Sequence, residues 1–191
     1  MEIDGSLEIV ECPNVYPPSE DSYLLIRALS PNPGEMVLEI GCGSGIVSMH
    51  MALAGADVVA CDIDPDAVAC AKGNAERNGI RMRVVQSDLF SDVDGVFDLI
   101  VFNLPYLPFS DDGPMAKAWS GGADGLGPLG RLLKELPRRL RPGGQLVVVV
   151  SSLSDMKAFE KMAAGFQVET LASEKLFFEE LKVISLRPTT S

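Results

Sequence analysis

Short, almost continuously apolar segments alternate with helix-like segments along most of this 191-residue chain. The apolar segments are rich in valine, isoleucine and leucine, and they occupy residues 37–41, 56–63, 82–88, 97–103 and 144–151. Strands that are apolar on both faces lie between two covering layers, and strands that alternate with helices run parallel. The pattern therefore predicts an α/β fold in which helices cover both faces of a mostly parallel sheet.

The C-terminal part of the chain departs from this alternation. Two further strands are expected around Val168–Ala172 and Leu181–Leu186, joined only by the segment LASEKLFFEEL. A connection this short holds no crossover helix and makes the pair antiparallel, so one strand should run against the rest. Helices are expected at about residues 19–29, 44–54, 65–78, 126–140 and 153–164, with Pro142-Gly143-Gly144 ending the fourth.

Length and composition set the class of protein. The chain suits one domain, 1–191, with about residues 1–33 as a short N-terminal cap segment ahead of the first strand. The longest apolar run, Leu146–Val150, has the length of a strand and not of a membrane span. The acidic N-terminus lacks the features of a signal peptide, so the expected location is the cytoplasm.

Charge, cysteine and histidine content exclude several functions. A net charge of −11 argues against free DNA or RNA as the main partner, because phosphate binding requires a basic face. The four cysteines have no close paired spacing, which argues against a zinc ribbon, a redox dithiol or a disulfide framework. His50, the only histidine, falls in an expected helix and is assigned a structural role. Serine–histidine–aspartate hydrolysis and a histidine-rich metal site are therefore not expected.

Polar or glycine-rich residues follow four of the expected strands, at the edge where ligands bind in sheets of this kind. The first strand ends in LEIGCGSG, where Gly41, Gly43 and Gly45 allow a tight turn and bring a ligand close to the backbone of a helix beginning at Ser44. This spacing differs from the dinucleotide motif G-x-G-x-x-G. Glu39 would repel a pyrophosphate and would suit an ammonium or a sulfonium. A plain strand–helix turn is the alternative reading of the glycines alone.

The next two strand ends carry aspartates. Asp62 lies about twenty residues beyond the glycine loop, where an acidic side chain accepts hydrogen bonds from ribose hydroxyls. Asp64 is assigned instead to capping the helix that Pro65 begins. Asp88, with Leu89 beside it, is a candidate acceptor for the exocyclic amine of a base, and a simple turn aspartate is its alternative.

Taken together, these strand ends resemble those of the class I S-adenosylmethionine-dependent methyltransferases. The resemblance implies a three-layer sandwich around a seven-stranded sheet whose final strand is reversed. It also implies that S-adenosyl-L-methionine is held between the first three strand ends by Glu39, Gly41, Gly43, Gly45, Asp62, Asp88 and Leu89.

The fourth strand end, Asn103-Leu104-Pro105-Tyr106, resembles the [N/D]-P-P-[Y/F] motif of methyltransferases that alkylate a planar nitrogen. Asn103 Oδ1 and the backbone carbonyl of Leu104 would each accept one N–H of the target, beside the donor. Tyr106 would stack on the flat face of the target, and Pro105 would make the backbone of this motif more rigid. Leu104 departs from the commoner double-proline form, which should be tolerated because this position contributes its backbone carbonyl.

Two further segments resemble one subgroup, the archaeal and eukaryotic HemK-type methyltransferases that modify the glutamine of the GGQ motif in class-one release factors. These segments are Val15–Leu29 and Ala118–Leu136. The resemblance implies that Ser22 contacts the donor and that Glu20–Asp21 line the mouth of the site. It also implies a small zinc-ribbon activator protein as partner, which we expect to add a strand alongside Met82–Asp88, the predicted sheet edge.

Other functions remain open at this point. The Asn103–Tyr106 motif would also suit methylation of an adenine N6 amine in DNA or RNA, although the negative net charge of the chain opposes binding to nucleic acid. Lysine methylation gains little from a clamp for a flat amide. A nicotinamide-dependent oxidoreductase is another alternative, but Glu39 and the glycine spacing argue against it. A non-catalytic binding module with the same fold is the last alternative.

Overall fold

The computed structural model describes residues 1–104 and 126–189. Within them, seven strands form one sheet in the order β3-β2-β1-β4-β5-β7-β6. Neighbouring strands are parallel except for the two pairs that include β7, so the last strand runs against the others, as the sequence predicts. The strands are β1 (Met36–Ile40), β2 (Asp57–Asp62), β3 (Arg83–Gln86), β4 (Phe97–Asn103), β5 (Leu140–Ser151), β6 (Phe166–Lys175) and β7 (Glu180–Pro188).

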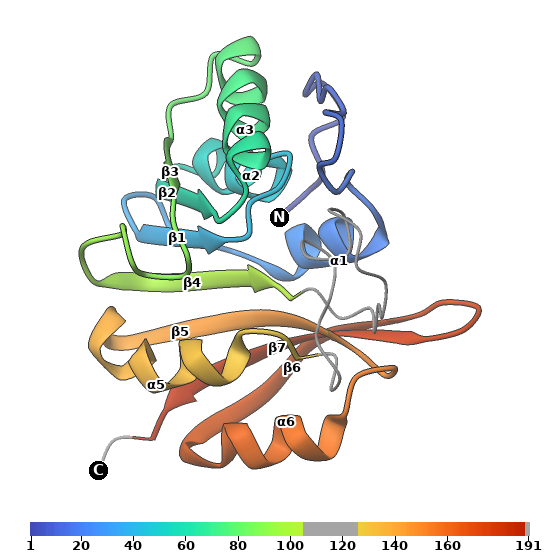
Figure 1. Ribbon diagram of the computed structural model, residues 1–191, viewed down its shortest axis with the longest axis vertical. Helices are drawn as coiled ribbons and strands as arrows, with labels where there is room; N and C mark the ends of the chain where they lie inside the picture. Colours follow the sequence, from blue (N-terminus) through green and yellow to red (C-terminus); the bar gives the residue numbers. More distant parts are fainter. Residues whose placement is uncertain (105–125, 190–191) are drawn as a thin grey trace.

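Helices cover both faces of this sheet, which confirms the predicted three-layer α/β sandwich (Figure 1). On one face lie α1 (Glu20–Ala28), α2 (Ile46–Leu53) and α3 (Pro65–Arg77), and on the other lie α5 (Leu129–Arg139) and α6 (Met156–Met162), which continues into the short η1 (Ala163–Gly165). Alternate strand residues supply the two cores. In β4, Val101 packs with α1 and α2, whereas Ile100 and Phe102 pack with α5.

The start of β5 differs from the expectation. Pro142-Gly143-Gly144 was expected to separate a helix from a strand, but β5 begins already at Leu140 and includes all three residues. The ladder between β4 and β5 shifts register at this point, between Phe97 and Leu99. A Cβ on Gly144 would lie 3.0 Å from the carbonyl oxygens of Phe97 and Asp98, so glycine is required by close backbone approach and not by a loop.

Residues 1–19 form no helix or strand and run along α2 and α3. The backbone N–H of Asp4 donates to His50 Nε2 at 3.0 Å, and that of Val10 donates to Asn74 Oδ1 at 2.9 Å. The ring of His50 is buried and its Nδ1 bonds the Ile46 carbonyl oxygen at 2.8 Å, which supports its structural assignment. These bonds fix the course of the segment before it reaches the carboxyl ends of the strands.

A disulfide joins this segment to α3. Cys12 and Cys70 are bonded across 58 residues of sequence, whereas Cys42 and Cys61 are free and buried. The expectation from cysteine spacing was therefore wrong for this pair, because the fold brings two distant positions together. In the part of the chain described here, no helix has both the length and the apolar character needed to cross a membrane.

Candidate active site

A cavity of about 350 Å³ opens at the carboxyl ends of β1, β2 and β4. The segment after β3 and the start of α1 complete its wall. The structure places nearly all of the described predicted site residues on this one cavity. They are Ser22, Glu39, Gly41, Gly43, Asp62, Asp88, Leu89, Asn103 and Leu104.

Gly45 is the exception among the described residues predicted for the donor site, because it is not part of the cavity wall. It is the N-cap of α2, which begins at Ile46 and not at Ser44, and its φ is +82°. A Cβ at this position would lie 3.0 Å from the Cβ of Ala71 in α3. Gly45 therefore lets the loop pack against α3, and its predicted contact with a ligand is not supported by this placement.

Asp62, at the end of β2, holds the glycine loop in place. Its Oδ2 accepts the backbone N–H of Gly43 at 3.0 Å, and its Oδ1 accepts that of Asp64 at 3.0 Å. Burial raises the pKa of the Asp62 carboxyl, and these backbone bonds oppose the rise. Asp64 caps α3 by accepting the N–H of Asp66 at 2.9 Å, as predicted. Asp62 thus joins the ends of β1 and β2 on the cavity wall.

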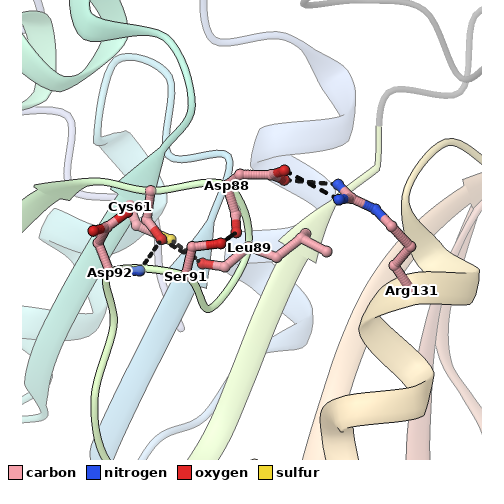
Figure 2. Close-up of polar contacts among 7 residues, drawn as sticks. Cys61, Asp88, Leu89, Ser91, Asp92 and Arg131 are labelled. Carbon is pink, nitrogen blue, oxygen red and sulfur yellow. Dashed lines mark hydrogen bonds and ion pairs between the residues drawn. The ribbon is translucent and has the colours of Figure 1, made fainter.

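Asp88 forms an ion pair that the sequence did not indicate. Arg131 of α5 points at it from across the cavity, with guanidinium nitrogens 2.7 and 3.0 Å from the two carboxylate oxygens (Figure 2). This bidentate contact holds the pKa of Asp88 below its usual value. Both oxygens keep a further lone pair, so Asp88 can still accept a donor from a ligand. The sequence gives no signal for Arg131, because helix arginines are usually solvated.

The residue after Asp88 has an unusual backbone conformation. Leu89 has a φ of +53°, in the left-handed region that a leucine rarely adopts. Its carbonyl oxygen accepts a hydrogen bond from Ser87 Oγ at 2.9 Å and a weaker contact from Cys61 Sγ at 3.6 Å, and Figure 2 shows the latter. Strain that is held in place by such contacts is typical of ligand sites.

Asn103 is the last residue of β4 and lies opposite Val149 of β5. Its Oδ1 is buried and has no hydrogen-bond partner among the residues described. A buried acceptor without a donor is costly, so Asn103 Oδ1 is a candidate acceptor for a donor group of a ligand. The neighbouring Leu104 is 1% exposed and packs its side chain into the core beside α5. Pro105 and Tyr106 lie outside the described residues.

The segment before and at the start of α1 closes another side of the cavity. Ser22 is buried, and its Oγ donates to Asp21 Oδ1 at 3.1 Å. Tyr16, on the cavity wall, donates from its hydroxyl to Asp21 Oδ2 at 3.2 Å. Glu20 is exposed and is not on the wall, so of the predicted pair Glu20–Asp21 only Asp21 lines the site. Tyr16 lies in the segment Val15–Leu29 that resembles the HemK-type subgroup, but the sequence did not indicate a role for this residue.

Carboxylates dominate the charge on the cavity wall. The side chain of Glu39 is 2% exposed, and burial raises its pKa to about 8, although Ser48 Oγ donates to it. Arg131 supplies the cationic charge of the wall. Four aspartates give the wall its negative charge, and a ligand with a positive centre would also favour the ionised form of Glu39. The acidic residues on the wall are Asp21, Glu39, Asp62, Asp64 and Asp88.

The raised pKa of Glu39 predicts a specific pH dependence of stability. Its carboxyl ionises near pH 4.5 in the unfolded chain and near pH 8 in the folded one. Between these values the folded state binds one more proton, so the contribution of Glu39 to the free energy of unfolding falls as pH rises from about 5 to about 8. Urea unfolding at both pH values should show wild type losing stability relative to Glu39→Gln, which keeps an acceptor for Ser48. An equal difference at both pH values would contradict this ionisation.

Within the described residues, no group of histidine, cysteine, aspartate or glutamate side chains is arranged to hold a metal ion.

Comparison with known proteins places the chain in a family. Residues 7–179 match the methyltransferase small domain. A protein of Methanocaldococcus jannaschii, provisionally named a protein N5-glutamine methyltransferase, is 43% identical over 192 residues, covering 97% of both chains. Methyltransferase HEMK2 of Mus musculus is 33% identical over 189 residues, covering 90% of this chain and 88% of its own.

A solved structure shares the fold. The Encephalitozoon cuniculi Mtq2–Trm112 complex, described as responsible for methylation of the translation termination factor eRF1, contains a chain that superposes with a TM-score of 0.73. The two chains are 21% identical, and the match covers 92% of this chain and 99% of the other. With a family match over most of its length and relatives this similar, the chain belongs to the methyltransferase small domain family.

Proposed function

We propose that this protein transfers a methyl group from S-adenosyl-L-methionine to the side-chain amide nitrogen of a glutamine, the one in the GGQ motif of a class-one release factor. The observation that carries the proposal is the buried, unpartnered Oδ1 of Asn103 at the edge of an acidic cavity. An acceptor in this position needs an N–H donor, and a primary amide offers two.

The cavity fits the donor by its chemistry. S-adenosyl-L-methionine supplies a methyl group on a positively charged sulfur, together with an ammonium, a ribose and an adenine. Asp62 would accept from the ribose hydroxyls, and Asp88 from the adenine amine while Arg131 keeps its carboxylate in place. Glu39 and Ser22 would border the positively charged end, and the backbone at Gly41 and Gly43 would lie against it.

The proposed reaction depends on orientation. An amide nitrogen is a poor nucleophile because its lone pair is delocalised into the carbonyl. Asn103 Oδ1 and the carbonyl of residue 104 would accept its two N–H groups and turn its face toward the methyl carbon. As the nitrogen–carbon bond forms, the carbon–sulfur bond breaks, S-adenosyl-L-homocysteine leaves, and the nitrogen loses one of its two protons to solvent. Tyr106, outside the described residues, would cover the opposite face. Fixing two reactants in this way contributes several kcal/mol, on the order of what oriented intramolecular reactions gain.

The choice of glutamine over other planar nitrogens rests on the relatives. The Methanocaldococcus jannaschii protein, matched over 97% of both chains, carries N5-glutamine methyltransferase in its name. The solved complex with the same fold is described as methylating a termination factor. The chain's net charge of −11 also favours a protein substrate over nucleic acid. The protein would then act in the cytoplasm.

An activator protein is part of the proposal. β3 lies at one edge of the sheet, as predicted, and pairs only with β2 among the strands described. Its free edge, Arg83–Gln86, can accept a strand from a partner, which we propose is a small zinc-ribbon protein. The Mtq2 chain in the solved complex is itself bound to Trm112, which is consistent with such an assembly.

Mass spectrometry of the substrate tests the proposal directly. Incubation with methyl-labelled S-adenosyl-L-methionine and an archaeal class-one release factor, with and without the activator, should add one methyl to the GGQ glutamine. A release factor with Gln→Ala in GGQ is the matched control and should remain unlabelled. Label that appears only on tRNA or ribosomal RNA added to the same reaction would assign the enzyme to nucleic acid instead.

A further inference from the structure

The turn between β6 and β7 presents two phenylalanines to solvent. Phe177 is 92% exposed and Phe178 is 86% exposed, and their rings pack edge to face with centroids 4.6 Å apart. The flanking residues close the turn, with Leu176 N donating to the Glu179 carbonyl oxygen at 2.8 Å. These are the two most exposed large apolar side chains among the described residues.

The stability of the hairpin does not explain why two phenylalanines, Phe177 and Phe178, occupy its turn. Tight hairpin turns favour asparagine, aspartate and glycine at the two central positions. Phe177 and Phe178 bury little surface against the rest of the chain, so they contribute little to stability while exposing apolar area. Local sequence choices that oppose local structure are most often found at functional sites.

Hydrogen bonds and an ion pair hold this hairpin in one position. Ser152 N donates to the Glu180 carbonyl oxygen at 2.9 Å, and Glu180 N donates to Ser152 Oγ at 2.9 Å. Glu174 of β6 forms an ion pair with Arg27 of α1 at 3.0 Å. Because these contacts hold the backbone of the hairpin, little backbone entropy is lost when a partner binds the aromatic pair.

The hairpin lies at the edge of the sheet where methyl transfer is proposed. Asn103 is opposite Val149, and Val149 is opposite Val183 in β7. Figure 1 shows the β6–β7 turn extending beyond the carboxyl ends of the parallel strands. With ordinary strand spacings, Phe178 lies roughly 20 Å from Asn103, a span that one protein substrate can bridge.

The sheet order places the proposed donor and activator sites on the side of β4 away from the hairpin. The groups proposed to bind the donor follow β1, β2 and β3, and the edge proposed for the activator is β3. β5, β7 and β6 lie on the other side of Asn103. A protein whose glutamine reaches Asn103 could therefore extend over β5 and the β6–β7 hairpin without covering the described residues that are proposed to bind the donor and the activator.

From this placement we infer that Phe177 and Phe178 form an aromatic anchor that inserts into an apolar pocket on the release factor and docks it while its GGQ loop enters the site. The inference rests on the proposed function and adds the surface that recognises the substrate outside GGQ. Exposed aromatic residues that become buried at an interface contribute more to binding than most other side chains.

The test compares two substrates and two variants. The double variant Phe177→Ser/Phe178→Ser is expected to lower kcat/KM for the intact release factor roughly 10- to 100-fold, mainly through KM. With a short peptide spanning GGQ its kinetics should equal those of wild type. The control Val168→Ser removes another half-exposed apolar residue from β6 and should leave both substrates unaffected.

The outcomes separate this inference from the proposed function. If wild type, assayed together with its activator, methylates neither the GGQ peptide nor the release factor, the proposed function fails. If wild type methylates both and the double variant acts on the intact factor as well as wild type does, the anchor is refuted. An equal loss on peptide and protein also refutes docking, because the change then acts on the site itself. Wild-type dimers in sedimentation that the double variant lacks, with unchanged kinetics, would assign the two phenylalanines to self-association.

Discussion

Asn103→Ala is expected to lower the rate of methyl transfer at least about 100-fold and to leave the Kd for S-adenosyl-L-methionine within a few-fold of wild type. The Oδ1 atom that this change removes is the acceptor proposed to orient the target amide. Removing one positioned hydrogen-bond partner from a reacting group typically costs a factor of 10² to 10³ in kcat. Single-turnover transfer to the GGQ peptide and calorimetric titration of the donor would measure the two effects separately.

Stability measurements distinguish this role from a structural one. Truncating a buried polar side chain usually destabilises a protein, because its former partner is left unsatisfied. Asn103 Oδ1 has no partner among the described residues, so the alanine variant should unfold at the wild-type temperature or slightly above it. A clear fall in Tm, or a donor Kd weakened as strongly as the rate, would show that Asn103 supports the fold or the donor site instead.

Most of the fold follows from the apolar segments of the sequence. β1, β2, β4 and β5 are buried on both faces, and their valine-rich runs predicted a covered parallel sheet. The short connection between the last two strands predicted the reversed β7, and the structure confirms it. The same alternation put carboxylates and glycines at one sheet edge, which is why the residues of the cavity could be proposed from sequence.

Two long-range contacts could not be predicted from the sequence. Arg131 meets Asp88 across 43 residues, and Cys12 meets Cys70 across 58. Neither pair has a local pattern, because an arginine on a helix and a cysteine in a loop are compatible with many partners. Both contacts are consequences of how α3 and α5 pack beside the sheet, and that packing is visible only in three dimensions.

Local geometry explains the remaining differences. Pro142-Gly143-Gly144 indicates a loop when read alone, but the register shift opposite Phe97 keeps it in β5. Gly45 belongs to the same G-x-G-x-G spacing as Gly41 and Gly43. However, glycine is needed at position 45 because a side chain there would clash with Ala71, and not because a ligand approaches. The sequence shows that glycine is required at such positions, and only the structure shows which neighbour requires it.

Asp62→Ala should have the opposite signature to Asn103→Ala, with the donor Kd raised roughly 100-fold and little further loss of rate at saturating donor. Asp62 binds the N–H groups of Gly43 and Asp64, so its removal frees the glycine loop as well as deleting a ribose acceptor. Charge-assisted bonds of this kind contribute about 1.5–3 kcal/mol each, and losing even one of them accounts for most of the change. Asp62→Asn keeps one oxygen acceptor, and its Kd should fall between those of the alanine variant and wild type.

Asp57→Ala is the control for overall charge. It removes a carboxylate from the exposed start of the same strand and should leave the donor Kd unchanged, since it alters only the net charge of the protein. Equal weakening by Asp57→Ala would mean that overall charge, and not the bonds made by Asp62, controls donor affinity.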